Sequence, residues 1–165
     1  MTQFQNEIEI EAAPDVVFDE LSDQRHEMRW SPKMRSVELL TGEPITAGSR
    51  LRARWAGTPG NDVVYIEYER PRRWAMRFTS WLMVAETSGD LVPTATGTRL
   101  TSTWNMYLRG PLRPLSGVVA RNIGKGVSES IQLAKAHVEQ QSRAAGHDPK
   151  RRSVDVTGPG EPDPH

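Results

Sequence analysis

Few side chains in this 165-residue sequence could carry acid–base chemistry in an apolar interior. The candidates are Glu86, Ser102, Tyr107, Ser130 and His137. Such groups transfer protons when burial and neighbouring charges bring their pKa values near the working pH. Glu86 would be the most informative, because a carboxylate facing an apolar cavity is hard to explain by structure alone. Gly89 is compatible with a bulge in the same strand, so the pattern leaves open whether Glu86 faces the interior or the solvent.

Nucleophilic and metal-dependent chemistry are both poorly supported. The chain has no cysteine, which excludes disulfides, thiolate metal sites and cysteine nucleophiles together. No serine has the flanking residues of a nucleophile elbow. No pair of histidines or acids has ligand spacing on a predicted helix or strand, so we expect no metal and no cofactor. We interpret His137 as a hydrogen-bonded core histidine; the other histidines lie in a polar turn or in the C-terminal tail, namely His26, His147 and His165.

Composition indicates one soluble domain with a polar tail. Hydrophobic residues make up 36% of the chain and charged residues 25%, and the net charge is +0, which gives no general attraction to nucleic acid. The longest strictly apolar run, Trp81 to Ala85, is far too short to cross a bilayer. The polar N-terminus lacks the apolar run of a signal peptide. We therefore expect a cytoplasmic protein with no membrane segment.

Seven arginines could form a phosphate-binding patch on neighbouring strands. They are Arg50, Arg52, Arg54, Arg70, Arg72, Arg73 and Arg77. The interpretation we favour is the solvated outer face of a sheet, with Glu67 and Glu69 offsetting the charge. No aromatic residues interleave with the arginines on that face, which argues against single-stranded nucleic acid as a partner.

The longest periodic segment, Gly110 to Gln141, predicts one amphipathic helix. At about 100° per residue, a band roughly 100° wide faces inward. It holds Leu112, Leu115, Val119, Ile123, Leu133, Ala134 and His137. The opposite side holds Arg121, Lys125, Ser128, Lys135 and Glu139. Pro111 and Pro114 suit the first turn, although Pro114 would equally delay the start of the helix.

Two residues interrupt the apolar band of this helix. Gly126 and Ser130 also face inward, and a glycine inside a helix costs about 1 kcal/mol relative to alanine. Close packing of the helix on a sheet would explain them. So would a bound molecule that needs the space left by Gly126 and the hydroxyl of Ser130. The sequence leaves both interpretations open.

Upstream of the helix, alternating apolar residues predict strands joined by short turns. The predicted strands are Phe4 to Glu11, Val37 to Leu40, Arg50 to Trp55, Val63 to Glu69, Trp74 to Thr79, Met83 to Val92 and Thr98 to Leu108. Val64, Ile66 and Tyr68 are expected to share one face of the fourth strand. The hairpin-length turns favour an antiparallel meander. Its inner face would hold Leu51, Ala53, Trp55, Met76, Phe78, Leu100, Trp104 and Met106.

Two short helical segments separate the first strand from the meander, and a polar tail follows the long helix. Pro14 and Asp15 suit the first turn of a helix within Ala12 to Asp23. A second short helix or turn ends before Pro32, and Trp30 within it is interpreted as a core residue or as a plug at the rim of a pocket. From Ser142 on, Gly, Pro and charged residues dominate. We therefore expect a folded domain over 1–141 and a disordered tail over 142–165.

This order of elements resembles the START-like helix-grip superfamily (SRPBCC), in particular its polyketide cyclase/dehydrase and lipid-transport branch. Four stretches carry the resemblance, which covers Gln3 to Gln141: IEIEAAPDVVFDELSD, MRWSPKMRSVELL, YERPRRWAMRF and GTRLT. The resemblance implies an α+β fold, with a curved antiparallel sheet of about seven strands, two short N-terminal helices and a long C-terminal helix across it. It also implies a cavity between helix and sheet for a lipid, polyketide, quinone or other hydrophobic molecule.

Three functions are compatible with such a fold. The first is binding or transport of a small hydrophobic ligand, lined by Trp30, Trp55, Met76, Phe78, Ser102, Trp104, Met106, Val119, Ile123, Gly126 and Ser130. The second is a cyclase or dehydratase that uses acid–base residues in the same cavity, without a metal or a covalent nucleophile. The third is a protein-interaction module without a ligand. A buried carboxylate near a histidine or tyrosine would favour the enzyme, and a filled cavity would favour the interaction module.

Overall fold

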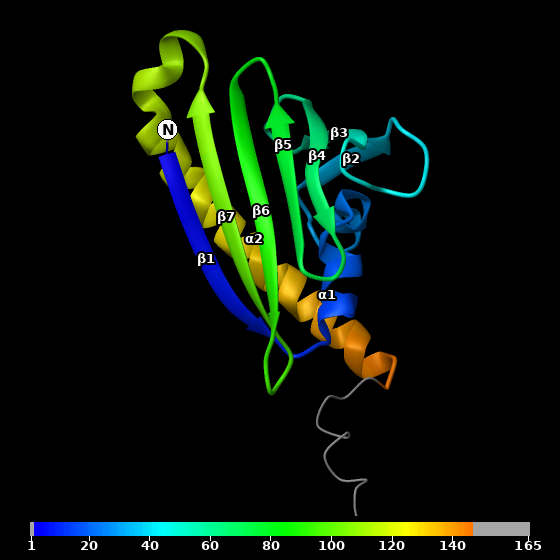
Figure 1. Cartoon of the computed structure of the whole chain (residues 1–165). Helices are drawn as coiled ribbons and strands as arrows, with labels where there is room; N and C mark the ends of the chain where they lie inside the picture. The colour runs from blue at the N-terminus through cyan, green and yellow to red at the C-terminus, as the bar shows by residue number, and fades with distance from the viewer. Residues whose placement is uncertain (1, 147–165) are drawn as a thin grey trace, which may run out of the picture.

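The computed structural model describes residues 2–146, which form one curved antiparallel sheet with helices on one side (Figure 1). Within these residues the seven strands follow the order β1-β7-β6-β5-β4-β3-β2, so that β1 and β2 are the edges. The first strand pairs with the last, β7, and every other pair of neighbouring strands is also consecutive in the sequence. The strands are β1 (Thr2–Ile10), β2 (Met34–Leu39), β3 (Arg50–Trp55), β4 (Asn61–Glu69), β5 (Arg73–Thr79), β6 (Met83–Pro93) and β7 (Thr98–Leu108).

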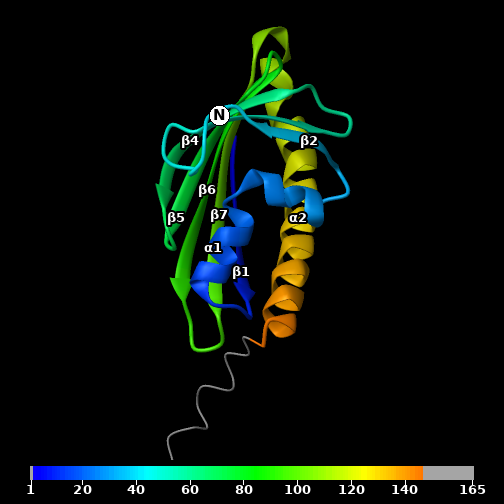
Figure 2. The same ribbon diagram turned by 90° about the vertical axis from the view of Figure 1, so that its right-hand side faces the viewer.

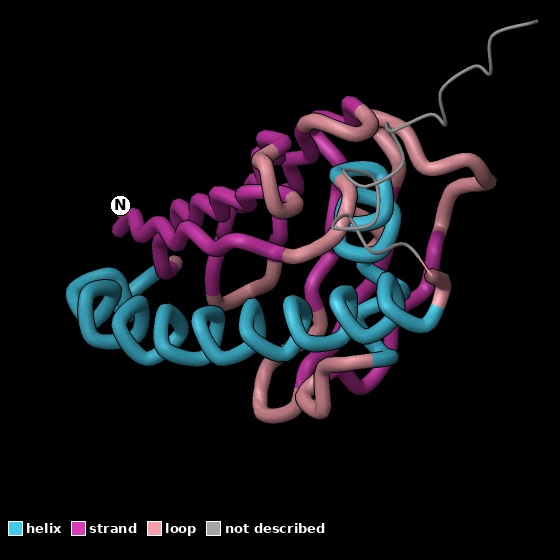
Figure 3. Tube along the Cα trace, turned by 90° about the horizontal axis from the view of Figure 1, so that it is seen from below, coloured by secondary structure: helices cyan, strands magenta, loops and turns pink. Residues whose placement is uncertain are grey.

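The helical segments lie on the same side of this sheet. They are α1 (Pro14–Leu21), the short 3-10 helices η1 (Gln24–Arg29) and η2 (Gly110–Leu115), and α2 (Ser116–Ala144). Figure 2 shows α1 between the sheet and α2. Figure 3 shows α2 extending across one side of the sheet. This is the predicted α+β arrangement of a long helix laid across a curved antiparallel sheet.

The predicted single helix from Gly110 is divided in two. The 3-10 helix η2 contains Pro114, and the α-helix begins only at Ser116. Proline has no N–H to donate, so a regular helix cannot run through this position without losing a hydrogen bond. At the other end α2 continues to Ala144, beyond the predicted boundary at Gln141, and Ser142 is buried. The predicted tail from residue 147 on, with His147 and His165, lies outside the described residues.

The inward face of α2 is rotated relative to the prediction. Leu133 was expected to face inward but is exposed, and Glu139 was expected to face solvent but is buried. Leu115, which was also expected to face inward, lies in η2 and is exposed. Glu139 is drawn inward because its Oε1 accepts the backbone N–H of Glu11 at 2.9 Å, at the end of β1. Ala134 is buried as predicted, and Val138, which follows one turn later, is buried as well, whereas Leu133 is not.

The prediction that Val64, Ile66 and Tyr68 share one face of β4 is wrong. The register of β4 against β5 shifts between Tyr65 and Glu67, which marks a bulge. Before the bulge, Val63 and Tyr65 are buried and Ile66 is exposed. After it, Tyr68 returns to the inner side. A bulge adds one residue to one strand, so it exchanges the two faces of everything that follows.

Gly89 has a different role from the suspected bulge. The register of β6 with β5 and with β7 is regular through this position. A Cβ atom at Gly89 would lie 2.4 Å from Cζ2 of Trp74, so the indole ring packs directly on the glycine backbone. With the register regular, Ala85 and Thr87 face the interior and Glu86 faces outward, which settles the orientation that the sequence left open.

Aromatic residues attach α1 and η1 to the inner face of the sheet. The ring of Phe18 in α1 packs edge-on against Tyr68, with ring centroids 5.1 Å apart, and against Trp74 at 5.6 Å. The hydroxyl of Tyr65 donates to the backbone oxygen of Ser22 at 2.7 Å and accepts the backbone N–H of Gln24 at 3.2 Å. These contacts fix the segment Ser22 to Gln24 and so place η1 above the strands.

Candidate functional site

A cavity of about 590 Å³ lies between α2 and the inner face of the sheet. Its walls come from η1, the turn between β3 and β4, strands β5 to β7, and α2. Ten of the residues expected around a ligand line it: Trp30, Trp55, Met76, Phe78, Ser102, Trp104, Val119, Ile123, Gly126 and Ser130. The exposed lining residues Lys33, Gly57, Thr58 and Asn122 mark where it opens to solvent.

An aromatic row forms the floor of the cavity. The ring centroids of Trp55 and Phe78 are 5.8 Å apart, and those of Phe78 and Trp104 are 6.0 Å apart with nearly parallel planes. These side chains come from β3, β5 and β7, which alternate in the sheet. The strands between them place smaller residues opposite Phe78, namely Val63 and Ala85. Large rings on alternate strands can thus approach one another while the space above them stays open.

The helix side of the cavity is open at Gly126. A Cβ atom there would meet only Nζ of Lys33, at 3.4 Å, and no strand atom lies within 4 Å. Close packing of Gly126 on the sheet, one of the two interpretations of this glycine, is therefore wrong. Together with Ser130, one turn further along, Gly126 leaves space between helix and floor.

Four of the predicted site residues do not line the cavity, namely Met106, Tyr107, Glu86 and His137. Met106 points inward but is fully buried in the core and does not line the cavity. Tyr107, the next residue in β7, faces the opposite side of the sheet and is exposed. Glu86 is on the outer face as well, where its Oε1 lies 2.7 Å from Nη2 of Arg77. Side chains alternate along a strand, so the regular register of β6 and β7 excludes Tyr107 and Glu86 from the cavity.

His137 belongs to a polar cluster outside the cavity lining. Its Nε2 lies 3.0 Å from Oε1 of Glu20, a buried carboxylate in α1. The other oxygen of Glu20 accepts from Nη1 of Arg29 at 2.9 Å and lies 3.3 Å from Nδ1 of His26. Glu20 thus joins α1, η1 and the C-terminal half of α2. The predicted hydrogen bond of His137 agrees with this arrangement, although the side chain is only partly buried, with 21% of its surface exposed.

Two carboxylates of the cavity lining, Asp23 and Glu27, were missed by sequence reasoning. Asp23 is paired with Arg25 at 2.7 Å. Glu27 in η1 lines the cavity, and its Oε1 accepts the indole N–H of Trp55 at 2.7 Å. Its Oε2 accepts from the amide of Gln24. Burial raises the pKa of Glu27, and hydrogen bonds from Trp55, Ser31 and Gln24 only partly oppose the rise. A 3-10 turn has no strong apolar period, and Trp55 is 28 residues away, so no local pattern indicated this contact.

We expect the Glu27→Gln substitution to change how stability depends on pH. A carboxyl whose pKa is raised on folding binds more protons in the folded than in the unfolded state. Stability is therefore lost as pH rises from the ordinary value of 4.5 through the raised folded value. Each unit of rise corresponds to about 1.4 kcal/mol, or about 3–6 °C in melting temperature.

The measurement is the melting temperature of both proteins between pH 4 and pH 8. The melting temperature of Glu27→Gln minus that of the wild type should be smallest at pH 4 and should increase with pH. Glu38→Gln, which removes an exposed carboxylate from β2, serves as the matched control and should show no such trend. Parallel curves for Glu27→Gln and the wild type would contradict a raised pKa.

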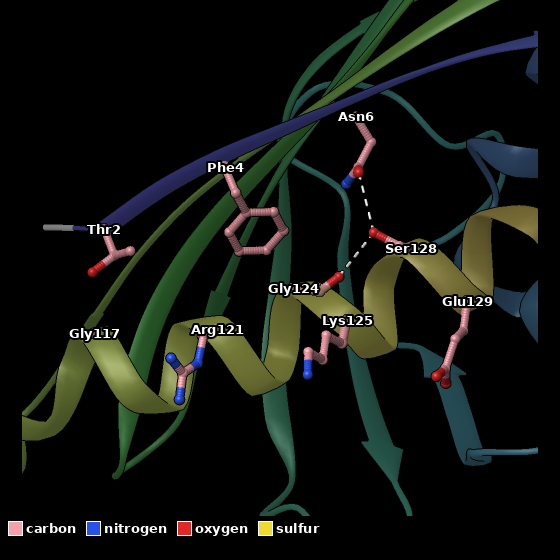
Figure 4. A pocket seen from close by; sticks show the side chains of 9 residues that line it. All are labelled: Thr2, Phe4, Asn6, Gly117, Arg121, Gly124, Lys125, Ser128 and Glu129. Atoms are coloured by element: carbon pink, nitrogen blue, oxygen red, sulfur yellow. Dashed lines mark hydrogen bonds between the residues drawn. The ribbon is translucent and has the colours of Figure 1, made fainter.

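A second hollow lies on the surface between β1 and the first half of α2 (Figure 4). It measures about 550 Å³, and its rim is charged and exposed at Arg121, Lys125 and Glu129. Oγ of Ser128 crosses it to reach Oδ1 of Asn6 at 3.1 Å. Phe4 lines this groove and stacks on Trp104 at 5.9 Å, so it separates the groove from the cavity. The groove lacks the aromatic floor and the enclosure of the cavity, which is the better candidate site.

The arginines of the predicted patch are largely paired with carboxylates. Ion pairs join Arg52 to Asp62, Arg70 to Asp19, Arg72 to Glu69, Arg73 to Glu67 and Asp90, and Arg77 to Glu86. This pairing favours the solvated outer face over a phosphate-binding patch. Within residues 2–146, no cluster of three or more potential metal ligands occurs, and no helix is both long and apolar enough to span a bilayer.

Comparison with known proteins places the chain among similar sequences and folds. A family model described as polyketide cyclase/dehydrase and lipid transport matches residues 1–139. The uncharacterized protein Rv2574 of Mycobacterium tuberculosis is 30% identical over 115 residues, covering 67% of this chain and 69% of its own length. The Mycobacterium bovis protein Mb2604 matches to the same extent.

Solved structures with the same fold are more distant in sequence. The Zhui aromatase/cyclase from Streptomyces sp. R1128 superposes with a TM-score of 0.76 at 16% identity, covering 88% of this chain and 98% of that one. A START superfamily protein from Mycobacterium smegmatis superposes with a TM-score of 0.72 at 14% identity, covering 84% of this chain and 98% of that one. At these identities the likeness concerns the fold, and it confirms the predicted helix-grip arrangement.

Proposed function

The chain belongs to the polyketide cyclase/dehydrase and lipid transport family, and from that premise we propose that it binds a small hydrophobic molecule between α2 and the sheet. The observation that carries the proposal is the aromatic-floored cavity of about 590 Å³. Ligand sites in proteins typically measure about 300–1,000 Å³ and combine apolar walls with a few polar groups. The cavity meets both conditions. It also argues against the interaction module, which would need no such space.

Apolar burial would supply most of the affinity. Covering about 300 Å² of ligand surface contributes about 7.5 kcal/mol at about 25 cal/mol per Å². Part of this gain is lost to the ordering of the ligand and of the side chains around it. A flat ring system would stack on the row formed by Trp55, Phe78 and Trp104.

Binding without catalysis is favoured over a cyclase or dehydratase. Acid–base catalysis in the cavity would need two groups that can pass a proton to and from one substrate. Of the polar lining residues, Ser102 and Ser130 contribute only unactivated hydroxyl groups. Within residues 2–146, Glu27 has no hydrogen bond to a histidine or tyrosine, and its partners are Trp55, Ser31 and Gln24. Asp23, the other carboxylate of the lining, is hydrogen-bonded to Arg25, and its Oδ2 lies 3.7 Å from Nε2 of His26, which is beyond hydrogen-bond distance. His137 and Glu20 form their pair outside the lining.

Native mass spectrometry of the protein purified from its own host tests this proposal. We expect an adduct of small-molecule mass that is lost on denaturation. With the stripped protein, titration with a panel of lipids, quinones and polyphenols should change tryptophan fluorescence by tens of per cent for at least one class, because Trp30, Trp55 and Trp104 all line the cavity. An unmodified mass together with flat titrations across the panel would contradict the proposal.

A further inference from the structure

We propose that the η1 end of the cavity recognises a hydroxyl group on an otherwise hydrophobic ligand, with Oδ1 of Asn61 accepting a hydrogen bond from the hydroxyl and Nε1 of Trp30 donating one to its oxygen. The inference rests on the proposed function and adds to it the chemical class of the ligand: a neutral phenol or alcohol. Two buried polar atoms carry it. Both belong to residues that line the cavity, and neither has a hydrogen-bond partner within residues 2–146.

The first of these atoms is Oδ1 of Asn61, at the start of β4. Asn61 is only 3% exposed, and its Nδ2 donates to the backbone oxygen of Pro59 at 3.0 Å. That hydrogen bond fixes which side of the amide carries the oxygen. Oδ1 is left as a buried acceptor with nothing to accept, although nearly all buried polar atoms in folded proteins have a partner.

The second atom is Nε1 of Trp30, at the end of η1. The indole N–H can only donate, and in Trp30 it has no acceptor within the described chain. Trp55 provides the contrast within the same cavity, because its N–H is satisfied by Glu27. The two tryptophans line the same cavity, but only the indole N–H of Trp30 lacks an acceptor among the described residues.

The pairing of β3 with β4 and one side-chain contact bring the two atoms to the same end of the cavity. Ala53 in β3 pairs with Asn61 in β4, and Trp55 lies two residues beyond Ala53 on the same face. Nε1 of Trp55 donates to Oε1 of Glu27 in η1 at 2.7 Å. The backbone N–H of Trp30 donates to the backbone oxygen of Glu27 at 3.2 Å. Asn61 from the sheet and Trp30 at the end of η1 are thus both linked to the Trp55–Glu27 contact, which places their unpaired acceptor and donor at the same end of the cavity.

A hydroxyl is the simple group that satisfies both atoms, because it donates one hydrogen bond and accepts others. An ether or ester oxygen could accept from Trp30 but would leave Asn61 unpaired. A ligand carboxylate offers only acceptors and would face the oxygens of Asn61 and Glu27. A hydroxyl could also reproduce the hydrogen bonds of a water molecule at this position, whereas an apolar group would displace such a water at a loss.

Three probes with one aromatic body test the inference by calorimetric titration: 2-naphthol, 2-methoxynaphthalene and naphthalene. We expect the wild-type protein to bind 2-naphthol about tenfold more tightly than 2-methoxynaphthalene, because only the naphthol can donate to Asn61. Trp30→Phe keeps an aromatic ring but removes the N–H. It should weaken 2-naphthol and 2-methoxynaphthalene about fivefold each and leave naphthalene unchanged.

Trp81→Phe is the matched control, since Trp81 is 73% exposed and lies outside the lining. It should leave all three affinities unchanged. Equal binding of the three probes to the wild type would overturn the inference and leave the proposed function standing, and this comparison needs no variant. Failure of all three to bind would overturn the inference, whereas the proposed function is overturned only by an unmodified native mass together with flat titrations across the panel of lipids, quinones and polyphenols. A loss of naphthalene binding in Trp30→Phe equal to that of 2-naphthol would also overturn the inference, because it would reduce Trp30 to a packing role.

Discussion

Ser130→Trp should abolish binding of a large ligand while sparing a small one. Ser130 projects from α2 into the cavity between Gly126 and Ala134, which also line it. An indole at this position would occupy space above the aromatic floor without disturbing the sheet. We expect the affinity for the four-ring probe 1-hydroxypyrene to fall at least about thirtyfold, which corresponds to about 2 kcal/mol. The affinity for 2-naphthol should change by less than about threefold.

The control introduces the same side chain on the exposed side of the same helix. Gln132→Trp, two residues further along, lies outside the lining and should bind both probes as the wild type does. Melting temperatures of both variants should stay within a few degrees of the wild type. If Ser130→Trp binds 1-hydroxypyrene normally, the ligand does not occupy the space between α2 and the sheet, and the proposed site is wrong.

Glu20→Ala should produce the largest loss of stability among single substitutions outside the apolar core. Glu20 is 6% exposed, is hydrogen-bonded to Arg29 and His137, and lies 3.3 Å from Nδ1 of His26. Removing one partner of a buried charged pair typically costs about 3 kcal/mol. For a domain of this size, that lowers the melting temperature by about 6–12 °C. The loss should be local at first, because His137 is one of the contacts that hold the C-terminal half of α2.

Amide hydrogen exchange locates the effect. Protection in Glu20→Ala should fall most in residues 131–144 of α2 and in α1, and less in β5 to β7. Asp19→Ala is the matched control: Asp19 is the neighbouring acid in α1, and its pair with Arg70 is exposed on both sides. Exposed pairs contribute about 0–1 kcal/mol, so this variant should melt within about 3 °C of the wild type. Equal melting temperatures for the two variants would refute the structural role of Glu20.

Local patterns determined much of the fold. The bounds of β3 and β7 agree with their alternation, because a strand with one buried face repeats every two residues and each repeat is visible in the sequence. The helical period of α2 was equally clear. Its inward face was less so, since Leu133 faces solvent and Glu139 is buried against the backbone of Glu11. A period shows that a helix has two sides, but distant partners decide how the helix is rotated.

The interior face of each strand depended on contacts that no local pattern encodes. The bulge between Tyr65 and Glu67 reversed the faces of β4, and the indole of Trp74 on Gly89 kept β6 regular where a bulge was suspected. Glu86 was thereby placed outside. A shift of one residue exchanges the faces of a strand at little local cost, so only the packing of the whole sheet selects the register.

The sequence by itself determined the family, the long helix over an antiparallel sheet, and ten of the residues that line the cavity, since these follow from alternation, period and a resemblance along the chain. Tertiary structure alone decided which polar groups meet. Glu27 meets Trp55 across 28 positions, and His137 meets Glu20 across 117. It also left the unpaired atoms of Trp30 and Asn61 at the cavity. Hydrogen bonds act over about 3 Å, whereas these partners are brought together only by the closure of the sheet and helix.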